Sequence, residues 1–142
     1  MPRISALGLD IGRRRVGVAG CDGLGLMATG LFTLKRTSFD RDVAELQSWV
    51  EEREVSILVV GLPYALDGTL TTQAKQIQKY ARRLSVALNL PVEYVDERLS
   101  SVEAEELMLA DGVSPSWNKE TIDRKAAALI LQRWLDERCR KS

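Results

Sequence analysis

Asp10 is a carboxylate near the end of a short apolar segment that reads as a β-strand. Strand alternation places Gly8, Asp10 and Gly12 on one face and Leu9 and Ile11 on the other. The two glycines leave space for another group to approach the carboxylate closely. The alternative interpretation is an aspartate that only shapes a turn before Gly12, and this segment by itself does not separate the two.

Asp96 and Glu97 follow a second strand-like segment over residues 91–95, so they lie at its carboxyl end. If the strand continues, alternation sends the two side chains to opposite faces, and at most one of them points toward Asp10. The competing interpretation is an acidic strand end beside a helix N-terminus, where the helix dipole favours negative charge.

Asp123 begins an otherwise apolar stripe on the helix expected at the end of the sequence. At 100° per residue it shares a face with Ala127, Ile130 and Trp134. A half-buried carboxylate needs a proton or a cation to compensate its charge, although an acidic residue in a first helical turn also suits the dipole. Carboxylate oxygens suit Mg²⁺ or Mn²⁺, and two such ions can hold the attacking and leaving oxygens in phosphodiester hydrolysis.

Three arginines, Arg13, Arg14 and Arg15, follow Asp10 directly on an expected hairpin turn. Guanidinium groups at this place could hold the phosphate backbone of a nucleic acid, and a solvated surface turn is the alternative. The sequence predicts that the other basic pairs are solvated helix or strand edges, and these pairs are Lys35-Arg36, Arg82-Arg83 and Arg124-Lys125. The last pair is a partial exception, because it neighbours Asp123.

The composition limits the chemistry that the chain can perform. The 142 residues contain no histidine and two cysteines, which excludes a Ser-His-Asp triad and a histidine-ligated metal. The two thiols are expected to be free in a reducing cytoplasm. Twenty basic residues balance twenty acidic ones, which counts mildly against tight nonspecific nucleic-acid binding but leaves local patches open. No segment is long and apolar enough to span a membrane, and no signal peptide is expected.

The elements that must position these residues follow from hydrophobic periodicity and turn residues. Four helices are expected over residues 38–53, 69–88, about 100–112 and 119–139, the third from a capping box of Ser100 and Glu103. Five strands are expected over residues 4–11, 15–21, 25–34, 55–60 and 91–95. This order predicts an α/β fold: a mixed five-stranded sheet of three antiparallel strands followed by parallel β-α units, with helices on both faces. Ligands of such sheets bind beyond the carboxyl ends of the strands.

Several short motifs occur together in an order that resembles the YqgF family. They are Leu9-Asp10-Ile11-Gly12 with Arg15, Gly17 and Ala19; Gly61-Leu62-Pro63 with Asp67-Gly68-Thr69; Asp96-Glu97-Arg98-Leu99-Ser100; and Ile122-Asp123 with Ala126-Ala127. Each motif is weak by itself, and the ordered set is specific. Ser101 departs from the threonine that the family usually carries, but it keeps a hydroxyl group.

The resemblance implies one ribonuclease H-like domain over residues 1–142 and a nuclease that acts in the cytoplasm. Position by position, it implies catalytic and metal-binding roles for Asp10, Glu97 and Asp123, with Mg²⁺ or Mn²⁺ as the ion, and so favours Glu97 over Asp96. Arg98 is expected to contact nucleic acid together with the arginine turn.

Four functions are compatible with these residues. The first is a nuclease for structured RNA that matures the 5′ end of 16S ribosomal RNA, and the second is a resolvase-like endonuclease for branched DNA such as Holliday junctions. Phosphate contacts carry little base information, so the sequence does not separate these two. An actin-like kinase or ATPase shares the core but needs two such domains. A catalytically silent nucleic-acid-binding module is the fourth, and metal-dependent cleavage distinguishes it from the nucleases.

Overall fold

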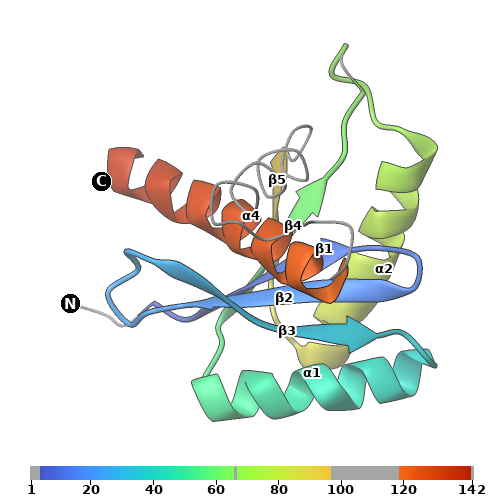
Figure 1. Cartoon of the computed structure of the whole chain (residues 1–142), viewed down its shortest axis with the longest axis horizontal. Helices are drawn as coiled ribbons and strands as arrows, with labels where there is room; N and C mark the ends of the chain where they lie inside the picture. Colours follow the sequence, from blue (N-terminus) through green and yellow to red (C-terminus); the bar gives the residue numbers. More distant parts are fainter. Residues whose placement is uncertain (1–3, 66, 97–118, 142) are drawn as a thin grey trace.

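The computed structural model describes residues 4–65, 67–96 and 119–141, which form one sheet with helices against both of its faces (Figure 1). The sheet has five strands in the order β3-β2-β1-β4-β5. The strand β1 (Ala6–Ile11) therefore lies at the centre of the sheet. Asp10 lies near the carboxyl end of this strand, as the sequence predicts.

The first half of the sheet is an antiparallel meander of β1, β2 (Arg15–Cys21) and β3 (Ala28–Lys35). Gly12 closes the turn between β1 and β2 by donating its backbone N–H to the carbonyl of Arg15 at 2.8 Å. In this register Asp10 lies directly opposite Gly17. Because Gly17 has no side chain, another element can pack close beside the Asp10 carboxylate.

The second half is parallel and is built from two β-α connections. The strand β4 (Ile57–Leu62) pairs with β1, and β5 (Val92–Asp96) pairs with β4. The helix α1 (Phe39–Arg53) precedes β4, and α2 (Thr72–Leu88) connects β4 to β5. Ser38 and Thr71 cap the two helices, because their side chains accept hydrogen bonds from the backbone N–H groups three residues later.

Two apolar cores lie on opposite faces of the sheet. One joins alternate strand residues such as Leu7, Leu9 and Leu58 to the buried stripes of α1 and α2. The other joins the intervening residues, such as Ala19 and Val59, to the helix α4 (Lys119–Lys141). This is the alternation that the sequence predicts, and it sends Leu9 and Asp10 to different faces.

Small residues let α4 lie directly against the sheet. A Cβ atom on Gly17 would overlap the carbonyl oxygen of Asp123, and one on Gly8 would come within 2.7 Å of the Cβ of Leu131. Ala127 is fully buried at this contact. The expectation that space is left beside Asp10 is therefore wrong at Gly8, where the helix occupies it.

The predicted order of elements is confirmed wherever the structure describes the chain, including Ser38 as a cap. The helix expected over residues 100–112 lies outside the described residues. The second helix begins at Thr72 and not at Thr69, because Leu70 pairs with Tyr64 in an isolated bridge and Thr71 caps the helix. In the described ranges, no helix has the length and apolar character needed to cross a membrane.

Candidate active site

Asp10 and Asp123 line one pocket at the end of β1, as the sequence predicts for two of its three carboxylates. The pocket has a volume of about 360 Å³ and is lined further by Gly12, by the arginines of the β1–β2 turn and by Lys119. We call it the carboxylate pocket. Asp10 comes from the centre of the sheet and Asp123 from the first turns of α4, so the pocket exists only when helix and sheet are packed together.

Gly17 determines how closely the two aspartates approach. It is the cross-strand neighbour of Asp10, and the backbone of Asp123 rests on it where any side chain would stand. Ala127, one helical turn after Asp123, is fully buried against the sheet and fixes the rotation of the helix. The face of α4 that carries Asp123 is therefore turned toward β1 and β2.

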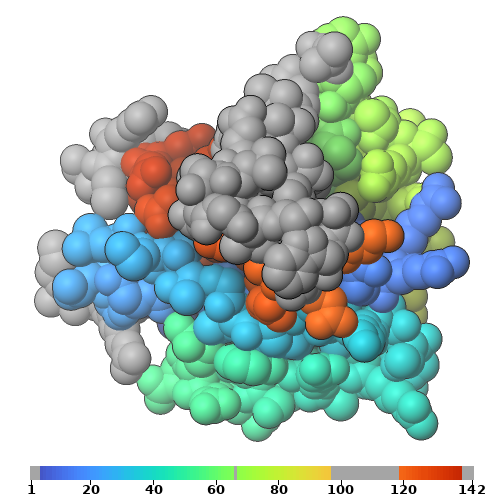
Figure 2. All heavy atoms as spheres, viewed as in Figure 1, coloured from blue at the N-terminus to red at the C-terminus, as the bar shows by residue number. Residues whose placement is uncertain are grey.

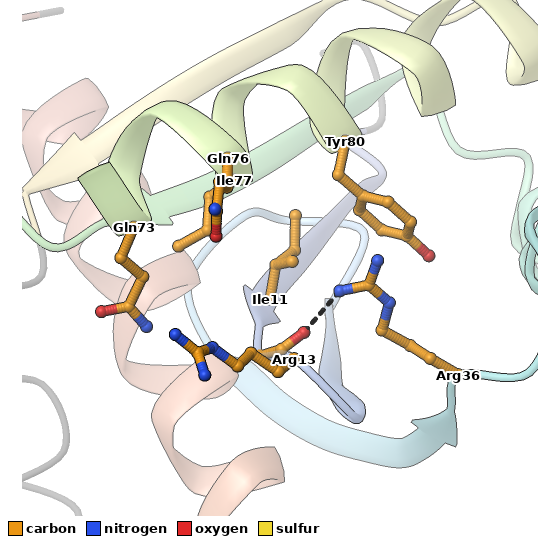
Figure 3. A pocket seen from close by; sticks show the side chains of 8 residues that line it. Ile11, Arg13, Arg36, Gln73, Gln76, Ile77 and Tyr80 are labelled. Carbon is orange, nitrogen blue, oxygen red and sulfur yellow. Dashed lines mark hydrogen bonds between the residues drawn. The ribbon is translucent and has the colours of Figure 1, made fainter. Parts of the chain in front are cut away.

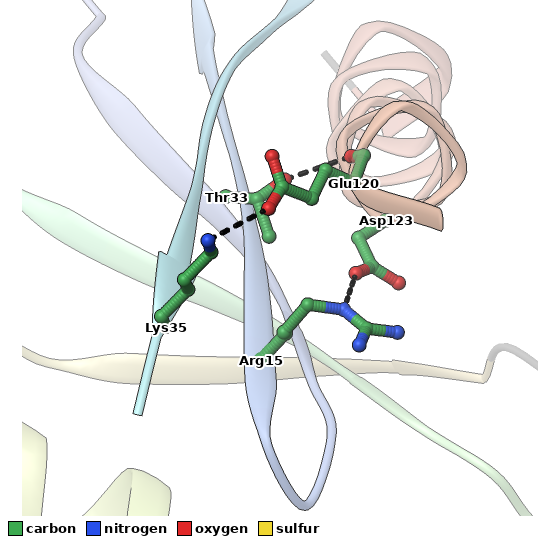
Figure 4. Close-up of polar contacts among 5 residues, drawn as sticks. All are labelled: Arg15, Thr33, Lys35, Glu120 and Asp123. Atoms are coloured by element: carbon green, nitrogen blue, oxygen red, sulfur yellow. Dashed lines mark hydrogen bonds and ion pairs between the residues drawn. The ribbon is translucent and has the colours of Figure 1, made fainter. Parts of the chain in front are cut away.

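Arg15 forms an ion pair with Asp123 inside this site. Its Nε donates to Oδ2 of Asp123 at 2.7 Å, and the two side chains are 33% and 21% exposed (Figure 4). The sequence predicts that Arg15 contacts phosphate together with its neighbours. In the structure its nearest anion is a carboxylate of the site itself, because β2 carries Arg15 directly beneath the start of α4.

The first turn of α4 is also tied to the edge strand β3. The hydroxyl of Thr33 donates to the backbone carbonyl of Glu120 at 2.7 Å, and the Lys35 ammonium lies 3.4 Å from the Glu120 carboxylate (Figure 4). Lys35 is exposed, as predicted for a solvated edge. These contacts hold the helix end that presents Asp123.

Arg13 and Arg14 are exposed on the β1–β2 turn (residues 12–14) and form no ion pair or hydrogen bond through their side chains within the described chain. Figure 2 shows this turn (blue) projecting from the surface beside the first turns of α4 (orange). Two carboxylates and four cationic side chains line the carboxylate pocket. The local charge is thus positive although the chain is neutral, which favours a phosphate ligand.

Asp96 does not belong to this pocket. It pairs in register with Leu62, which lies in the core under α1 and α2, so the Asp96 side chain points to the face opposite Asp10. Its backbone carbonyl accepts a hydrogen bond from Arg133 at 2.8 Å. Glu97 and Arg98, the other two expected site residues on this segment, lie outside the described residues.

A second pocket opens on the other side of the β1–β2 turn. It has a volume of about 250 Å³ and is lined by residues of the turn, of α2 and of the segment after β3. Gln73 and Gln76 supply amide groups, so we call it the glutamine pocket (Figure 3). Gly12 and Arg13 line both pockets, which makes the turn their common wall.

Arg36 forms part of this second pocket, and the prediction that it is a solvated edge residue is wrong. Its Nη1 donates to the carbonyl of Gly12 at 2.7 Å, and its guanidinium lies 4.1 Å from the centre of the Tyr80 ring. The Tyr80 hydroxyl in turn donates to the buried carboxylate of Asp42 at 3.0 Å. Burial and this carboxylate raise the pKa of Tyr80, so the phenol keeps its proton.

Sequence reasoning did not assign Lys119, Arg36 or the two glutamines to a functional site. The sequence could have indicated Lys119, because this residue precedes Asp123 by four positions and shares its helix face. Among the described residues, no group of three or more acidic, histidine or cysteine side chains is placed to hold a metal ion. The oxygens of Asp10 and Asp123 in one pocket are nevertheless the donors that a hard divalent cation takes.

Comparison with known proteins gives the same fold and a family. A family model described as "RuvX: Holliday junction resolvase" matches residues 4–137. A relative from Trichormus variabilis, named "Putative pre-16S rRNA nuclease", is 67% identical over 135 residues, covering 95% of this chain and 89% of its own. A relative of the same name from Rippkaea orientalis is 64% identical over 138 residues, covering 97% and 99%.

Among solved structures, Thermus thermophilus RuvC in complex with a Holliday junction substrate matches with a TM-score of 0.59 at 14% identity, covering 96% of each chain. Sheet order, flanking helices and carboxylates at the end of the central strand define a nuclease of ribonuclease H-like fold. Within that class, the chain belongs to the RuvX family, also called YqgF, as its motifs indicate.

Proposed function

We propose that this protein is a divalent-metal-dependent nuclease that cleaves structured RNA in the 5′-end maturation of 16S ribosomal RNA, in the cytoplasm. The observation that carries the proposal is the convergence of Asp10 and Asp123 in one pocket ringed by cationic side chains. The choice of RNA is supported by the names of relatives that match nearly the whole chain.

Asp10, Glu97 and Asp123 are the proposed metal-binding and catalytic residues. Asp10 and Asp123 supply oxygen donors from two elements, and Glu97 is the next carboxylate in the chain after Asp96, whose own side chain points away. Such a donor set fits Mg²⁺ or Mn²⁺. When bound, the ion supplies a Lewis acid and lowers the pKa of an attacking water.

The cationic residues divide the remaining work. Arg13, Arg14 and Lys119 attract and orient the scissile phosphate at the mouth of the pocket, and Arg98 extends the contact along the backbone. Arg15 balances the charge of the Asp123 carboxylate through their ion pair while no metal is bound. The packing of α4 on Gly17 fixes the separation of the two aspartates before any ligand arrives.

A cleavage screen tests the proposal. Purified protein is incubated with Mg²⁺, with Mn²⁺ or with excess EDTA, and with precursor 16S ribosomal RNA fragments, single-stranded RNA, duplex DNA and four-way DNA junctions. We expect metal-dependent cleavage of the precursor RNA, and full activity in EDTA would exclude the metal mechanism. Cys21→Ala and Cys139→Ala should both stay active, because no step uses a thiol.

A branched-DNA endonuclease is the second candidate, because the matching family model is described as a Holliday junction resolvase. The same screen separates the two. Preferential cleavage of four-way junctions over every RNA would replace the RNA proposal, whereas binding without cleavage of any substrate would indicate a silent binding module.

A further inference from the structure

The glutamine pocket lies outside the proposed chemistry and has its own composition. Its lining contains no acidic residue, whereas the carboxylate pocket contains two. Ile11 and Ile77, both buried, form an apolar floor, and the ring of Tyr80 forms a side wall. Two amides and two guanidinium groups surround this apolar surface, so the pocket is suited to a flat ligand with a polar edge.

The polar groups of the pocket are available to a ligand. The side chains of Gln73, Gln76 and Arg13 are exposed, and none of them forms a hydrogen bond or ion pair within the described chain. Figure 3 shows the Arg13 guanidinium and the Gln73 amide extending into the space between the turn and α2. An amide offers a donor and an acceptor side by side, the pattern that pairs with the edge of a nucleobase.

The wall behind these groups is held rigidly. Arg36 bonds to the Gly12 carbonyl and stacks on Tyr80, while Tyr80 bonds to Asp42. A side chain held at both ends loses little entropy when a ligand arrives, so this wall is preorganised. The volume of about 250 Å³ is below the range of about 300–1,000 Å³ typical of sites for drug-sized ligands. One base fits this scale better than a base pair.

We propose that the glutamine pocket binds a single unpaired nucleobase of the nucleic acid that is cleaved in the carboxylate pocket. The proposal rests on the proposed function, since it places two parts of one substrate on the two sides of one turn. Arg13 lines both pockets, so its guanidinium can contact the phosphate that links the bound base to the scissile position. Gln73 and Gln76 pair with the edge of the base, and Ile11 and Ile77 form the apolar floor on which it lies.

This arrangement selects substrates by their structure. A base in a continuous duplex is stacked and paired, and cannot enter a pocket sized for one ring system without being flipped out. A nucleotide in a bulge, loop or junction is already exposed and avoids that cost. The pocket therefore favours cleavage beside an unpaired nucleotide, in RNA or in DNA.

The test measures binding without cleavage, in EDTA, so that it stands apart from the nuclease chemistry. The probes are hairpins with one unpaired nucleotide, each made as RNA and as DNA, and matched hairpins with an abasic residue at that position. The wild type should bind the unpaired base about tenfold more tightly than the abasic probe, as expected for one stacked and hydrogen-bonded base. The double variant Gln73→Ala/Gln76→Ala should lose most of this preference and keep the same salt dependence, since no charge is removed.

Gln78→Ala is the matched control, because Gln78 lies on the same helix but does not line the pocket. It should keep the full preference. A second variant, Gln76→Glu, keeps the side-chain length and replaces the amide donor, and it should also lose the preference. Equal binding of the base and abasic probes by the wild type, or an undiminished preference in the double variant, would overturn the proposal. If the wild type shows this preference but cleaves no substrate with Mg²⁺ or Mn²⁺, the result would contradict the proposed function and leave the base-binding proposal standing.

Discussion

The two pockets on either side of the β1–β2 turn share a wall but differ in every other respect. The carboxylate pocket contains two acidic and four cationic side chains, and α4 brings one of the acids from far along the chain. The glutamine pocket contains neutral amides, apolar side chains and two arginines, and one of these is already bonded to the backbone. The proposed site of cleavage and the proposed site of base binding thus lie on opposite sides of the β1–β2 turn.

The largest effect is expected from a substitution of Asp10, which tests whether the carboxylate pocket carries the cleavage chemistry. Asp10→Asn keeps the shape of the side chain but removes the charge that holds the metal, so cleavage should fall to background. Binding in EDTA should persist or improve, because phosphate affinity comes from the cations and a repulsive charge is gone. Cleavage rates and nucleic-acid affinity are the two measurements.

Asp40→Asn is the control for this change, because Asp40 is exposed on α1 and lines neither pocket. It should cleave at the wild-type rate. An Asp10→Asn protein that cleaves as fast as this control would show that the carboxylate pocket does not carry the chemistry.

The second test concerns the shared wall. Replacing Arg13 and Arg14 by Gln should weaken nucleic-acid binding and lower the slope of log affinity against log salt by up to about 2, one for each phosphate contact. Adding Arg15→Gln should lower the slope little further, since Arg15 is already paired with Asp123. Affinity measured across a salt series gives both numbers.

Arg138→Gln serves as the control, because Arg138 is an exposed cation near the far end of α4. Its salt slope should match that of the wild type. An unchanged slope in the Arg13/Arg14 variant would mean that the turn is a solvated hairpin and that substrate approaches by another route.

Tyr80→Phe tests the rigid wall of the glutamine pocket. The variant leaves the Asp42 carboxylate, only 3% exposed, without its hydroxyl donor, so the free energy of unfolding should fall by about 1–3 kcal/mol. Because folding raises the pKa of Tyr80 above its ordinary value of 10.0, the wild type should also lose stability as the pH rises above that value. This loss should be smaller in the variant.

Denaturant unfolding at neutral and alkaline pH measures both effects. Tyr64→Phe is the control, because Tyr64 is half-buried and its hydroxyl makes no hydrogen bond within the described residues. Equal stability of the two phenylalanine variants would mean that the Tyr80 hydroxyl does not support the wall.

The smallest effect is expected at Arg15. Arg15→Gln frees the Asp123 carboxylate from a cation that competes with the metal, so the half-saturating metal concentration should fall. The change should be at most about fivefold, because an ion pair this exposed stabilises by up to about 1 kcal/mol. Mn²⁺ binding followed by electron paramagnetic resonance measures it without relying on activity.

Lys35→Gln is matched to it, because it removes the other ion pair at the start of α4 from outside the pocket. It should leave Mn²⁺ affinity unchanged. If the Arg15 variant binds Mn²⁺ no more tightly than this control, Arg15 does not compete with the metal for Asp123.

The sequence predicted the order of the elements along the chain and the approach of Asp10 to Asp123, because both residues have neighbours with a clear periodicity. Asp10 lies near the end of an alternating strand and Asp123 begins an apolar helical stripe, so the directions of their side chains follow from elementary geometry. The close approach of α4 at Gly17 depends on which residues are opposite one another, and that register is a property of the folded sheet. Glu97 stays a prediction, because it lies outside the described residues.

The glutamine pocket was not predictable in the same way. Gln73 and Gln76 are polar residues on a helix face that reads as solvated, and Arg36 belongs to a basic pair of ordinary appearance. What makes them a site is the β1–β2 turn standing opposite α2, a contact between segments far apart in the chain. Polar residues become informative only when the fold shows which of them lack partners.

The ion pair between Arg15 and Asp123 joins residues 108 positions apart in the sequence. Because of this separation, the residues of the two pockets are completed at different times during synthesis. The last residue in the sequence that lines the glutamine pocket is Tyr80, whereas the carboxylate pocket also includes Asp123. At about 5–20 residues per second, a ribosome needs several seconds more to deliver the second aspartate. All the residues that line the glutamine pocket are therefore synthesised several seconds before the last residue of the carboxylate pocket.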